Sequence, residues 1–329
     1  MNRRKLLLTT LATPTLATPR LAQAQPQNQA PWPSRGPVRV IVPFTPGGST
    51  DGMARVTAGK LQGKLGQTFI VENRAGANGA VGGQFVANAA PDGYTLCFSA
   101  SIQAMARLVM RNPGYDPLVD LVPIIRVGAG PLVLVVNPSR GPTTLPELIA
   151  AVRANPRAWN IAASSLGAAG HIATIELIRI LGVDIPVIPY RGTAPALTDV
   201  IANNVAMMID PILAMVPAVR GGTVRGLAIT ATRRADALPD LPTAAEQGQP
   251  SLDIQSWWGL WGPRGLPAEV TARIGEVLAT GMFDVDIAPR VNNMGIVPAA
   301  EIGADFARFI QAEFTRSEAL LRTANFQPE

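Results

Sequence analysis

The chain of 329 residues has little of the chemistry from which disulfides, metal sites and catalytic clusters are built, because it contains one cysteine and one histidine. Cys97 cannot form an internal disulfide. It lies in the apolar run 94–99, far from the N-terminus, so we interpret it as a small buried apolar residue, not a nucleophile or a lipid anchor. His171 alone cannot build a histidine-rich metal site. We therefore expect neither a metal nor a cofactor.

Motifs for nucleotide binding and for hydrolysis are also missing. The sequence contains no GxxxxGK[ST], no G-x-S-x-G and no H-E-x-x-H, and residues 76–83 have G-x-x-G-x-x-G spacing, not G-x-G-x-x-G. As a general base, His171 would need a partner, and Ser164 and Ser165 are the nearest candidates. The alternatives are a histidine that is hydrogen-bonded within the fold and one that contacts a ligand.

Long hydrophobic runs are absent, because no stretch after the N-terminal region reaches the roughly 18 uninterrupted apolar residues of a membrane span. Residues 1–24 are typical of a bacterial export signal: Arg3, Arg4 and Lys5 precede a modest apolar stretch, and residues 22–24 read Ala-Gln-Ala. The arginine pair resembles a twin-arginine signal, with an ordinary secretory signal as the alternative. We expect a periplasmic protein without membrane insertion, and a mobile leader over 25–36.

The positive charge of the chain belongs largely to the predicted signal. The whole sequence carries 28 Lys and Arg against 23 Asp and Glu, a net charge of +5. Residues 1–24 hold four of the basic residues and no acidic residue, so their removal leaves 24 against 23, a net charge of +1. A chain with so balanced a charge offers no basic surface for nucleic acid, and we expect no nucleic-acid partner.

Short apolar runs alternate with helical periodicity along the chain. This strand–loop–helix–strand order predicts an α/β fold with parallel strands, in two units of about 100 residues each followed by a mostly helical stretch from Pro267. One predicted helix ends at Gly66, and Thr144 and Glu147 have the spacing of a capping box. The predicted strands are Val38–Phe44, Thr68–Glu72, Tyr94–Ser99, Leu132–Val136, Asn160–Ala163, Ile185–Tyr190, Val205–Ile209 and Leu227–Thr230.

Three loops share one design: Thr45–Asp51 (TPGGSTD), Ser164–His171 (SSLGAAGH) and Arg191–Asp199 (RGTAPALTD). Each leaves a predicted strand, enters a predicted helix, and combines small residues with hydroxyl groups. A helix N-terminus has unpaired N–H groups and a partial positive charge, so three such loops could surround a small anion with few formal charges. The alternative is that they are ordinary connections whose side chains only cap the helices.

Three tryptophans, Trp257, Trp258 and Trp261, surround Gly259. We interpret them as core or hinge packing, and the alternative is an aromatic wall of a ligand site.

Taken in order, several segments resemble the Bug-type periplasmic solute-binding receptors of tripartite tricarboxylate transporters over nearly the whole chain after the signal. The segments that carry the resemblance are VRVIVPFTPGGSTDGMAR, LGQTFIVENRAGANG, APDGYTL, YDPLVDLVPI, SSLGAAGHIA, IPVIPYRGTAPALTDV, VRGLAITATRR, LPDLPTAAEQG and WWGLWGPRGLP. The resemblance implies a type II periplasmic-binding-protein fold, in which two α/β lobes are joined by two crossover strands. Lobe I would comprise residues 37–128 and 232–329, and lobe II residues 129–231.

The resemblance also implies a ligand cleft between the lobes, in which the glycine loop after the first strand opposes the two other loops. The residues expected to bind the ligand are Thr45, Gly47, Gly48, Ser49 and Asp51 on one side, and Ser164, Ser165, Gly167, His171, Tyr190, Thr193, Ala194 and Asp199 on the other. The second loop departs from the family's usual Ser-Gly-x-Gly-Ser/Thr-x-x-His, since Ser165 replaces the first glycine and Ala168 the hydroxyl residue. Asp199 is predicted where the third loop enters its helix. Three roles are open to it there: a cap of that helix, a group that repels a second carboxylate of the ligand, or a partner for an amine.

The function implied is that of a monomeric receptor that captures a small organic carboxylate and delivers it to membrane subunits of a transporter. It requires no reaction and no catalytic residue. Two alternatives stay open from the residues alone: a ligand-loaded sensor that acts on a membrane histidine kinase, and an exported hydrolase that uses His171 with a serine. The identity of the carboxylate cannot be read from a cleft built of backbone donors.

Overall fold

The computed structural model describes residues 32–293 and 295–328, and residues 32–329 form one compact unit. The predicted signal and residues 25–31 of the predicted leader lie outside the described residues. The prediction of a mobile leader is wrong for its last five residues. Trp32 packs edge-on against Phe69 with ring centroids 6.3 Å apart, and the N–H groups of Ser34 and Arg35 donate to the hydroxyl of Tyr94 at 3.0 and 2.9 Å.

One half of the fold is a mixed sheet whose strands follow the order β2 (Phe69–Asn73), β1 (Val38–Val42), β3 (Thr95–Ala100), β9 (Gln255–Pro263) and the first part of β4 (Leu121–Val136). β1 pairs in parallel with both of its neighbours, whereas β9 is antiparallel to β3 and to β4. The short strand β10 (Val297–Pro298) also pairs with β4. Strands from both ends of the chain therefore build this half.

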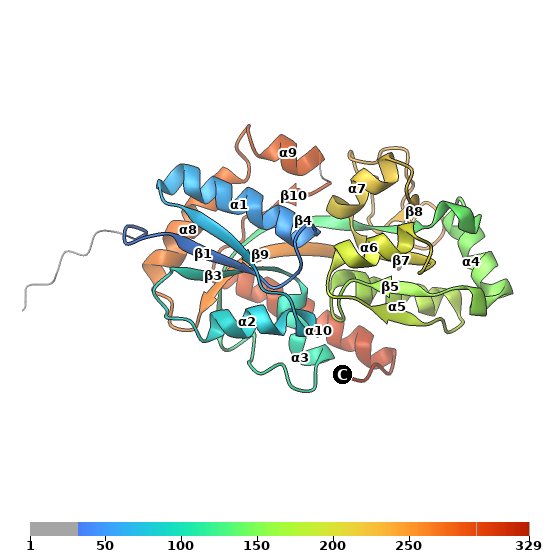
Figure 1. Ribbon diagram of the computed structural model, residues 1–329, viewed down its shortest axis with the longest axis horizontal. Helices are drawn as coiled ribbons and strands as arrows, with labels where there is room; N and C mark the ends of the chain where they lie inside the picture. The colour runs from blue at the N-terminus through green and yellow to red at the C-terminus, as the bar shows by residue number, and fades with distance from the viewer. Residues whose placement is uncertain (1–31, 294, 329) are drawn as a thin grey trace, which may run out of the picture. The chain divides into compact units, whose positions relative to one another are not determined.

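The other half is formed around the second part of β4. Residues Leu132–Val136 pair antiparallel with β7 (Met207–Pro211) and with β8 (Arg225–Ile229). β5 (Ile161–Ala163) runs parallel to β7, and β6 (Val187–Pro189) runs parallel to β5. β4 thus carries the chain from one lobe to the other and β9 brings it back, as Figure 1 shows. This is the two-lobed α/β fold that was predicted.

The two strands that cross between the lobes were the elements least visible in the sequence. β4 begins at Leu121, eleven residues before the predicted strand, and β9 was not predicted as a strand. The register of β4 against β9 shifts between Pro123 and Ile125 and again between Arg126 and Gly128. Bulges interrupt the two-residue alternation of apolar and polar residues by which a strand is recognised in a sequence. The two strands still pair along their length, but their sequences do not show the alternation.

Helices cover the sheets, and Gly66 ends the first of them in the left-handed conformation, at a φ of 66°, as predicted. Thr144 caps its helix by accepting from the N–H of Glu147 at 3.2 Å, but the Glu147 carboxylate accepts from Thr143, one residue before the position that a capping box requires. In the part of the chain that the structure describes, no helix combines the length and the apolar character of a membrane span. The helices are α1 (Ser49–Leu65), α2 (Ala80–Ala87), α3 (Ile102–Val109), α4 (Leu145–Ala154), α5 (Ala169–Leu181), α6 (Thr193–Ile201), α7 (Ile212–Arg220), α8 (Ala268–Gly281), α9 (Ala288–Asn293) and α10 (Ala304–Thr323).

An aromatic cluster fastens α10 to the crossover strand β9. Trp257 lies edge-on to the rings of Phe306 and Phe309, at centroid distances of 5.7 and 5.2 Å, and Trp261 also contacts Phe306. Both tryptophans and Phe306 are buried. The core interpretation of the tryptophans is thereby confirmed, and α10 packs against α3 of one lobe and α5 of the other (Figure 1).

Gly259 should not tolerate a side chain, because a Cβ atom there would overlap the ring of Phe306 and lie 2.9 Å from the carbonyl oxygen of Ile125. We expect Gly259→Ala to lower the free energy of unfolding by about 1–3 kcal/mol, the usual cost of overpacking. Gly63→Ala is the matched control. Gly63 lies within α1 with open space around it, so this change should stabilise the protein by about 0.5–1 kcal/mol. Urea unfolding measures both, and equal effects would contradict the packing described.

Candidate functional site

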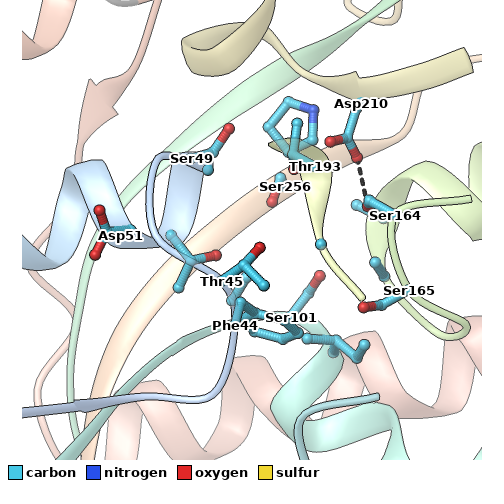
Figure 2. Close-up of a pocket in the computed structure, with 18 residues that line it drawn as sticks. Phe44, Thr45, Ser49, Asp51, Ser101, Ser164, Ser165, Thr193, Asp210 and Ser256 are labelled. Carbon is cyan, nitrogen blue, oxygen red and sulfur yellow. Dashed lines mark hydrogen bonds between the residues drawn. The ribbon is translucent and has the colours of Figure 1, made fainter. Parts of the chain in front are cut away.

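A pocket opens where the carboxyl ends of β1, β3 and β5 meet the start of α1, α3, α5 and α6 (Figure 2). Its volume is about 490 Å³, part of which is open to solvent. Ligands of open α/β sheets bind at such strand ends. The lining residues are Phe44, Thr45, Gly48, Ser49, Thr50, Asp51, Ala100, Ser101, Ile102, Ser164, Ser165, Ala168, Ala169, Gly192, Thr193, Asp210, Pro211 and Ser256.

Four helices begin at the wall of this pocket, at Ser49, Ile102, Ala169 and Thr193. No side chain among the described residues caps the N-terminus of any of the four. The first N–H groups of a helix have no partner within the helix and carry a partial positive charge. The pocket is therefore lined by backbone donors that favour an anion.

Polar side chains without partners point to the same conclusion. The hydroxyls of Ser49 and Ser101 are buried and have no hydrogen-bond partner among the described residues. Almost all buried polar groups in folded proteins are hydrogen-bonded, and the cost of leaving one unpaired is about 1–3 kcal/mol. Both residues line the pocket, and both are labelled in Figure 2. A bound molecule or water that reaches them would supply the missing partners.

The pocket holds no basic side chain that could pair with an anion. Among the described residues, those that line it include no lysine, arginine or histidine, and its ionisable groups are the carboxyls of Asp51 and Asp210. Any anion bound here must be held by helix N-termini and hydroxyls, and both carboxyls must be prevented from repelling it.

Asp51 is neutralised by partners outside the pocket. Its carboxylate accepts from the N–H of Gly47 at 3.0 Å, from two nitrogens of Arg55 at 3.0 and 2.9 Å, and from the amide of Asn73 at 3.0 Å. Burial alone would raise the pKa of Asp51, but these hydrogen bonds outweigh it and hold the pKa below its ordinary value. The side chain of Asn73 also donates to the carbonyl of Phe44 at 3.0 Å, so this network fixes the glycine loop.

In the part of the chain that the structure describes, Asp210 has no basic partner and is compensated only by the hydroxyls of Thr193 and Ser164. It lies at the end of β7 with none of its surface exposed, and its Oδ1 accepts from the hydroxyl of Ser164 at 2.8 Å, the dashed line in Figure 2. Burial raises the pKa of Asp210 to about 6, although the hydroxyls of Thr193 and Ser164 lower it. Oδ2 has no partner in hydrogen-bond geometry among the described residues. Asp210 is thus a carboxyl poised to take up a proton.

His171 does not line the pocket. Its Nδ1 accepts from the N–H of Gly167 at 3.1 Å, and its ring packs edge-on against Phe326. Burial lowers the pKa of His171 to about 4, so the ring is neutral at neutral pH. The hydroxyl of Ser164 donates to Asp210, not to the histidine. His171 is therefore hydrogen-bonded to its own loop, and ligand contact by this residue stays a prediction.

The third predicted loop is shorter than expected. α6 begins at Thr193, so Asp199 lies within the helix and cannot cap its N-terminus; that suggestion was wrong. Asp199 accepts from the hydroxyl of Tyr190 at 2.6 Å and from the amide of Asn204 at 3.1 Å. Neither Asp199 nor Tyr190 lines the pocket, and the same holds for Ala194.

The structure brings seven of the thirteen predicted site residues to the wall of the pocket: Thr45, Gly48, Ser49, Asp51, Ser164, Ser165 and Thr193. Gly47 and Gly167 stand beside them in the chain and shape their loops with φ values of 84° and 83°. Sequence reasoning missed Ser101, Asp210 and Ser256, because none of them lies in a glycine loop: Ser101 follows β3, and the other two lie near the ends of β7 and β9. Asp210 did carry a signal, since it is a charged residue directly after the apolar run Val205–Ile209.

Comparison with known proteins places the chain in a family context. The model of the family described as "Tripartite tricarboxylate transporter family receptor" matches residues 53–326. Protein BugT of Bordetella pertussis is 36% identical over 302 residues, which cover 91% of this chain and 92% of BugT.

Solved structures are similar over the same extent. The periplasmic binding protein BugD has a TM-score of 0.86 at 31% identity, with 90% of this chain and 100% of BugD covered. Rpa4515 of R. palustris with adipate has a TM-score of 0.88 at 35% identity, covering 91% and 100%. MatC from Rhodopseudomonas palustris with bound malate has a TM-score of 0.82 at 32% identity, covering 87% and 99%.

Replacing Asp51 by asparagine should destabilise the protein by about 1.5–3 kcal/mol at neutral pH, the range for hydrogen bonds to a charged group. The folded-state pKa lies below the ordinary value of 3.8, so this stabilisation is present above about pH 4 and is lost as the pH falls through the folded-state pKa. Denaturant unfolding of wild type and variant against pH tests this. Asp305→Asn is the control, because Asp305 is an exposed partner of Arg308 and its loss should cost less than about 1 kcal/mol. Equal losses would contradict the role given to Asp51.

Proposed function

The chain belongs to the tripartite tricarboxylate transporter family of receptors, and we propose that the pocket between its lobes is where it captures a small organic carboxylate. Receptors of this family are periplasmic solute-binding proteins of a membrane transporter, and this chain is such a solute-binding receptor. The finer proposals concern the site, the lobes, the export signal and the partner.

The observation that carries the proposed site is the chemistry of the pocket wall. In the part of the chain that the structure describes, four uncapped helix N-termini and the unpartnered hydroxyls of Ser49 and Ser101 converge on one cavity without a basic side chain. Such a site binds a carboxylate through dipoles and hydrogen bonds. Two similar proteins have adipate and malate bound, which supports dicarboxylates as the first ligands to test.

We assign residues 37–128 and 232–329 to lobe I and residues 129–231 to lobe II. In support, β4 exchanges its partner β9 for β7 and β8 between Pro131 and Leu132, and β8 ends at Ile229. Closure over a ligand then brings the loops of the two lobes together and excludes water, so ligand binding shifts the population toward the closed form.

Two hydrogen bonds connect the proposed lobes beside the pocket. The hydroxyl of Thr45 lies 3.5 Å from the carbonyl oxygen of Arg191, and the side chain of Asn78 accepts from the N–H of Leu166 at 3.3 Å. These are two long, weak hydrogen bonds. They leave the receptor able to open when the pocket is empty, and the ligand provides the remaining attraction.

Residues 1–24 are proposed to direct export through the twin-arginine or the general secretory route, and membrane subunits of a transporter are proposed as the partner. A sensor that acts on a histidine kinase would use the same pocket, and no feature of the described residues favours it. Uptake of a radiolabelled carboxylate by cells separates the two: it should require both the receptor and the transporter subunits. If cells that lack this receptor still take up the carboxylate but no longer show a kinase response to it, the transport role is contradicted.

Filling the pocket entrance should abolish ligand binding. A Cβ atom at Gly48 would lie 3.6 Å from Cβ of Thr193 on the opposite side, so Gly48→Leu places a large side chain between the two loops. Binding to the folded state alone stabilises a protein by about 2.7 kcal/mol at a ligand concentration of roughly 100 times Kd. A thermal-shift screen with a panel of carboxylates that includes adipate and malate measures this. A carboxylate that binds should raise the Tm of the wild type and leave the Tm of Gly48→Leu unchanged.

Gly63→Leu is the matched control for that experiment. It introduces the same side chain on the exposed face of α1 with open space around it, so its Tm should rise with ligand as in the wild type. A shift that persists in Gly48→Leu would place the ligand elsewhere. No shift in ligand-free wild type with any carboxylate would contradict the proposed ligand class.

A further inference from the structure

Asp210 presents a problem that the proposed function does not solve. The pocket is built for an anion, yet a fully buried carboxyl group forms part of its wall. If Asp210 were ionised, a ligand carboxylate would meet a like charge in a region of low dielectric, with no basic side chain in the wall to offset it. Oδ2 of Asp210, which has no partner among the described residues, would then be a hydrogen-bond acceptor facing a carboxylate oxygen of the ligand, which is also an acceptor.

We propose that Asp210 receives the ligand as a neutral carboxylic acid that donates a hydrogen bond from Oδ2 to a carboxylate oxygen of the ligand, so that binding takes up one proton from solvent. This inference rests on the proposed function and names a specificity-determining residue of the same site. The proton balance is simple: solvent supplies one proton to Asp210 as the ligand enters, and that proton returns to solvent on release.

The geometry around Asp210 favours this arrangement. Ser164 donates to Oδ1, which fixes the carboxyl plane and leaves Oδ2 as the oxygen available to a ligand. A protonated Oδ2 becomes a donor and joins the hydroxyl of Ser101 and the helix N-termini as a fully neutral set of donors. Burial already raises the pKa of Asp210 to about 6 in the empty pocket, and a nearby anion raises this pKa further.

No other titratable group on the surrounding elements is placed to supply the proton or to mask the charge. On α1, Asp51 is held by Arg55; on α5, Glu176 is held by Arg179 and His171 is neutral; on α6, Asp199 is held by Tyr190. The remaining charged groups on neighbouring segments are four arginines. Arg107 on α3 pairs with Asp116, and Arg191 before α6 is exposed. Arg220 on α7 donates to one backbone carbonyl and Arg225 on β8 donates to two. β4 places Val133 opposite Asp210, the residue after β5 that contacts it is Ser164, and β9 contributes Ser256 to the same pocket wall.

Isothermal titration calorimetry with adipate and with malate tests the inference directly. Free carboxylic acids titrate near pH 4, so both ligands are ionised between about pH 7 and pH 8 and any proton taken up there goes to the protein. Titrations in two buffers of different ionisation enthalpy, phosphate and Tris, should report an uptake approaching one proton per ligand bound. The Kd should rise by about tenfold for each unit of pH above neutrality.

Asp210→Asn supplies the matched variant, because its amide donates as the protonated acid does and has nearly the same shape. It should bind the same ligands with no proton uptake and with a Kd that is constant over this pH range. Asp210→Ala, which has no donor, should bind weakly at every pH. Unfolding curves check that both variants are folded, and Asp210→Asn should be at least as stable as the wild type at neutral pH, where burial of an ionised carboxyl costs stability.

The outcomes separate this inference from the function on which it rests. Binding by the wild type without proton uptake, together with loss of binding in Asp210→Asn, would overturn it and make Asp210 a charged acceptor for a hydroxyl or amine of the ligand. The receptor assignment would survive that result. Failure of adipate, malate and a wider carboxylate panel to bind the folded wild type between about pH 5 and pH 8 would overturn both.

Discussion

The constraint on which this structure depends is that the first N–H groups of a helix have no partner inside the helix. In most proteins a serine, threonine or aspartate side chain caps them. Here α1, α3, α5 and α6 begin around one cavity, and no side chain of the described residues caps them. The small residues Gly48 and Ala168 stand at two of the cap positions and leave the space in front of the N–H groups free. The fold therefore keeps its strongest unpaired donors for a molecule that is not part of the chain.

The long strands β4 and β9 run through both halves of the fold, and the aromatic cluster of Trp257, Trp261 and Phe306 packs α10 against β9. Under the proposed function, movement of the two halves about these strands would let a solute enter and leave the pocket.

The proposed site has hardly any formal charge with which to select one carboxylate over another. Backbone donors belong to every sequence and carry no code for one ligand, so the side chains that reach the pocket decide which solute fits. In this chain they include the ring of Phe44 and the carboxyls of Asp51 and Asp210, and the wall also has the hydroxyls of Thr45, Ser49, Thr50, Ser101, Ser164, Ser165, Thr193 and Ser256. The loss of the usual hydroxyl at Ala168 moves the polar character of the second loop toward Ser164 and Ser165.

Much of this could be predicted from the sequence, and what could not has physical reasons. The parallel strands, the Gly66 cap and the loops that hold Ser49, Ser164 and Thr193 follow from local patterns, and the resemblance supplied the cleft. The strand β9 could not be predicted, because it is buried from Ser256 to Pro263 and its pairing with β4 is interrupted by bulges. The place of Ser101 and Asp210 in the pocket depends on how strands far apart in the sequence align, which no local pattern encodes. Asp199 was misplaced because α6 begins six residues before it, directly after Gly192.

The most direct test of the central claim is a crystal structure of the protein with adipate. The account predicts that a carboxylate of the ligand lies at about 2.7–3.1 Å from N–H groups at the start of α1 or α6, with the buried hydroxyls of Ser49 or Ser101 and the carboxyl of Asp210 completing its shell. A carboxylate paired instead with an arginine or lysine side chain, or a ligand bound outside the pocket, would contradict the claim that uncapped helix N-termini hold the solute.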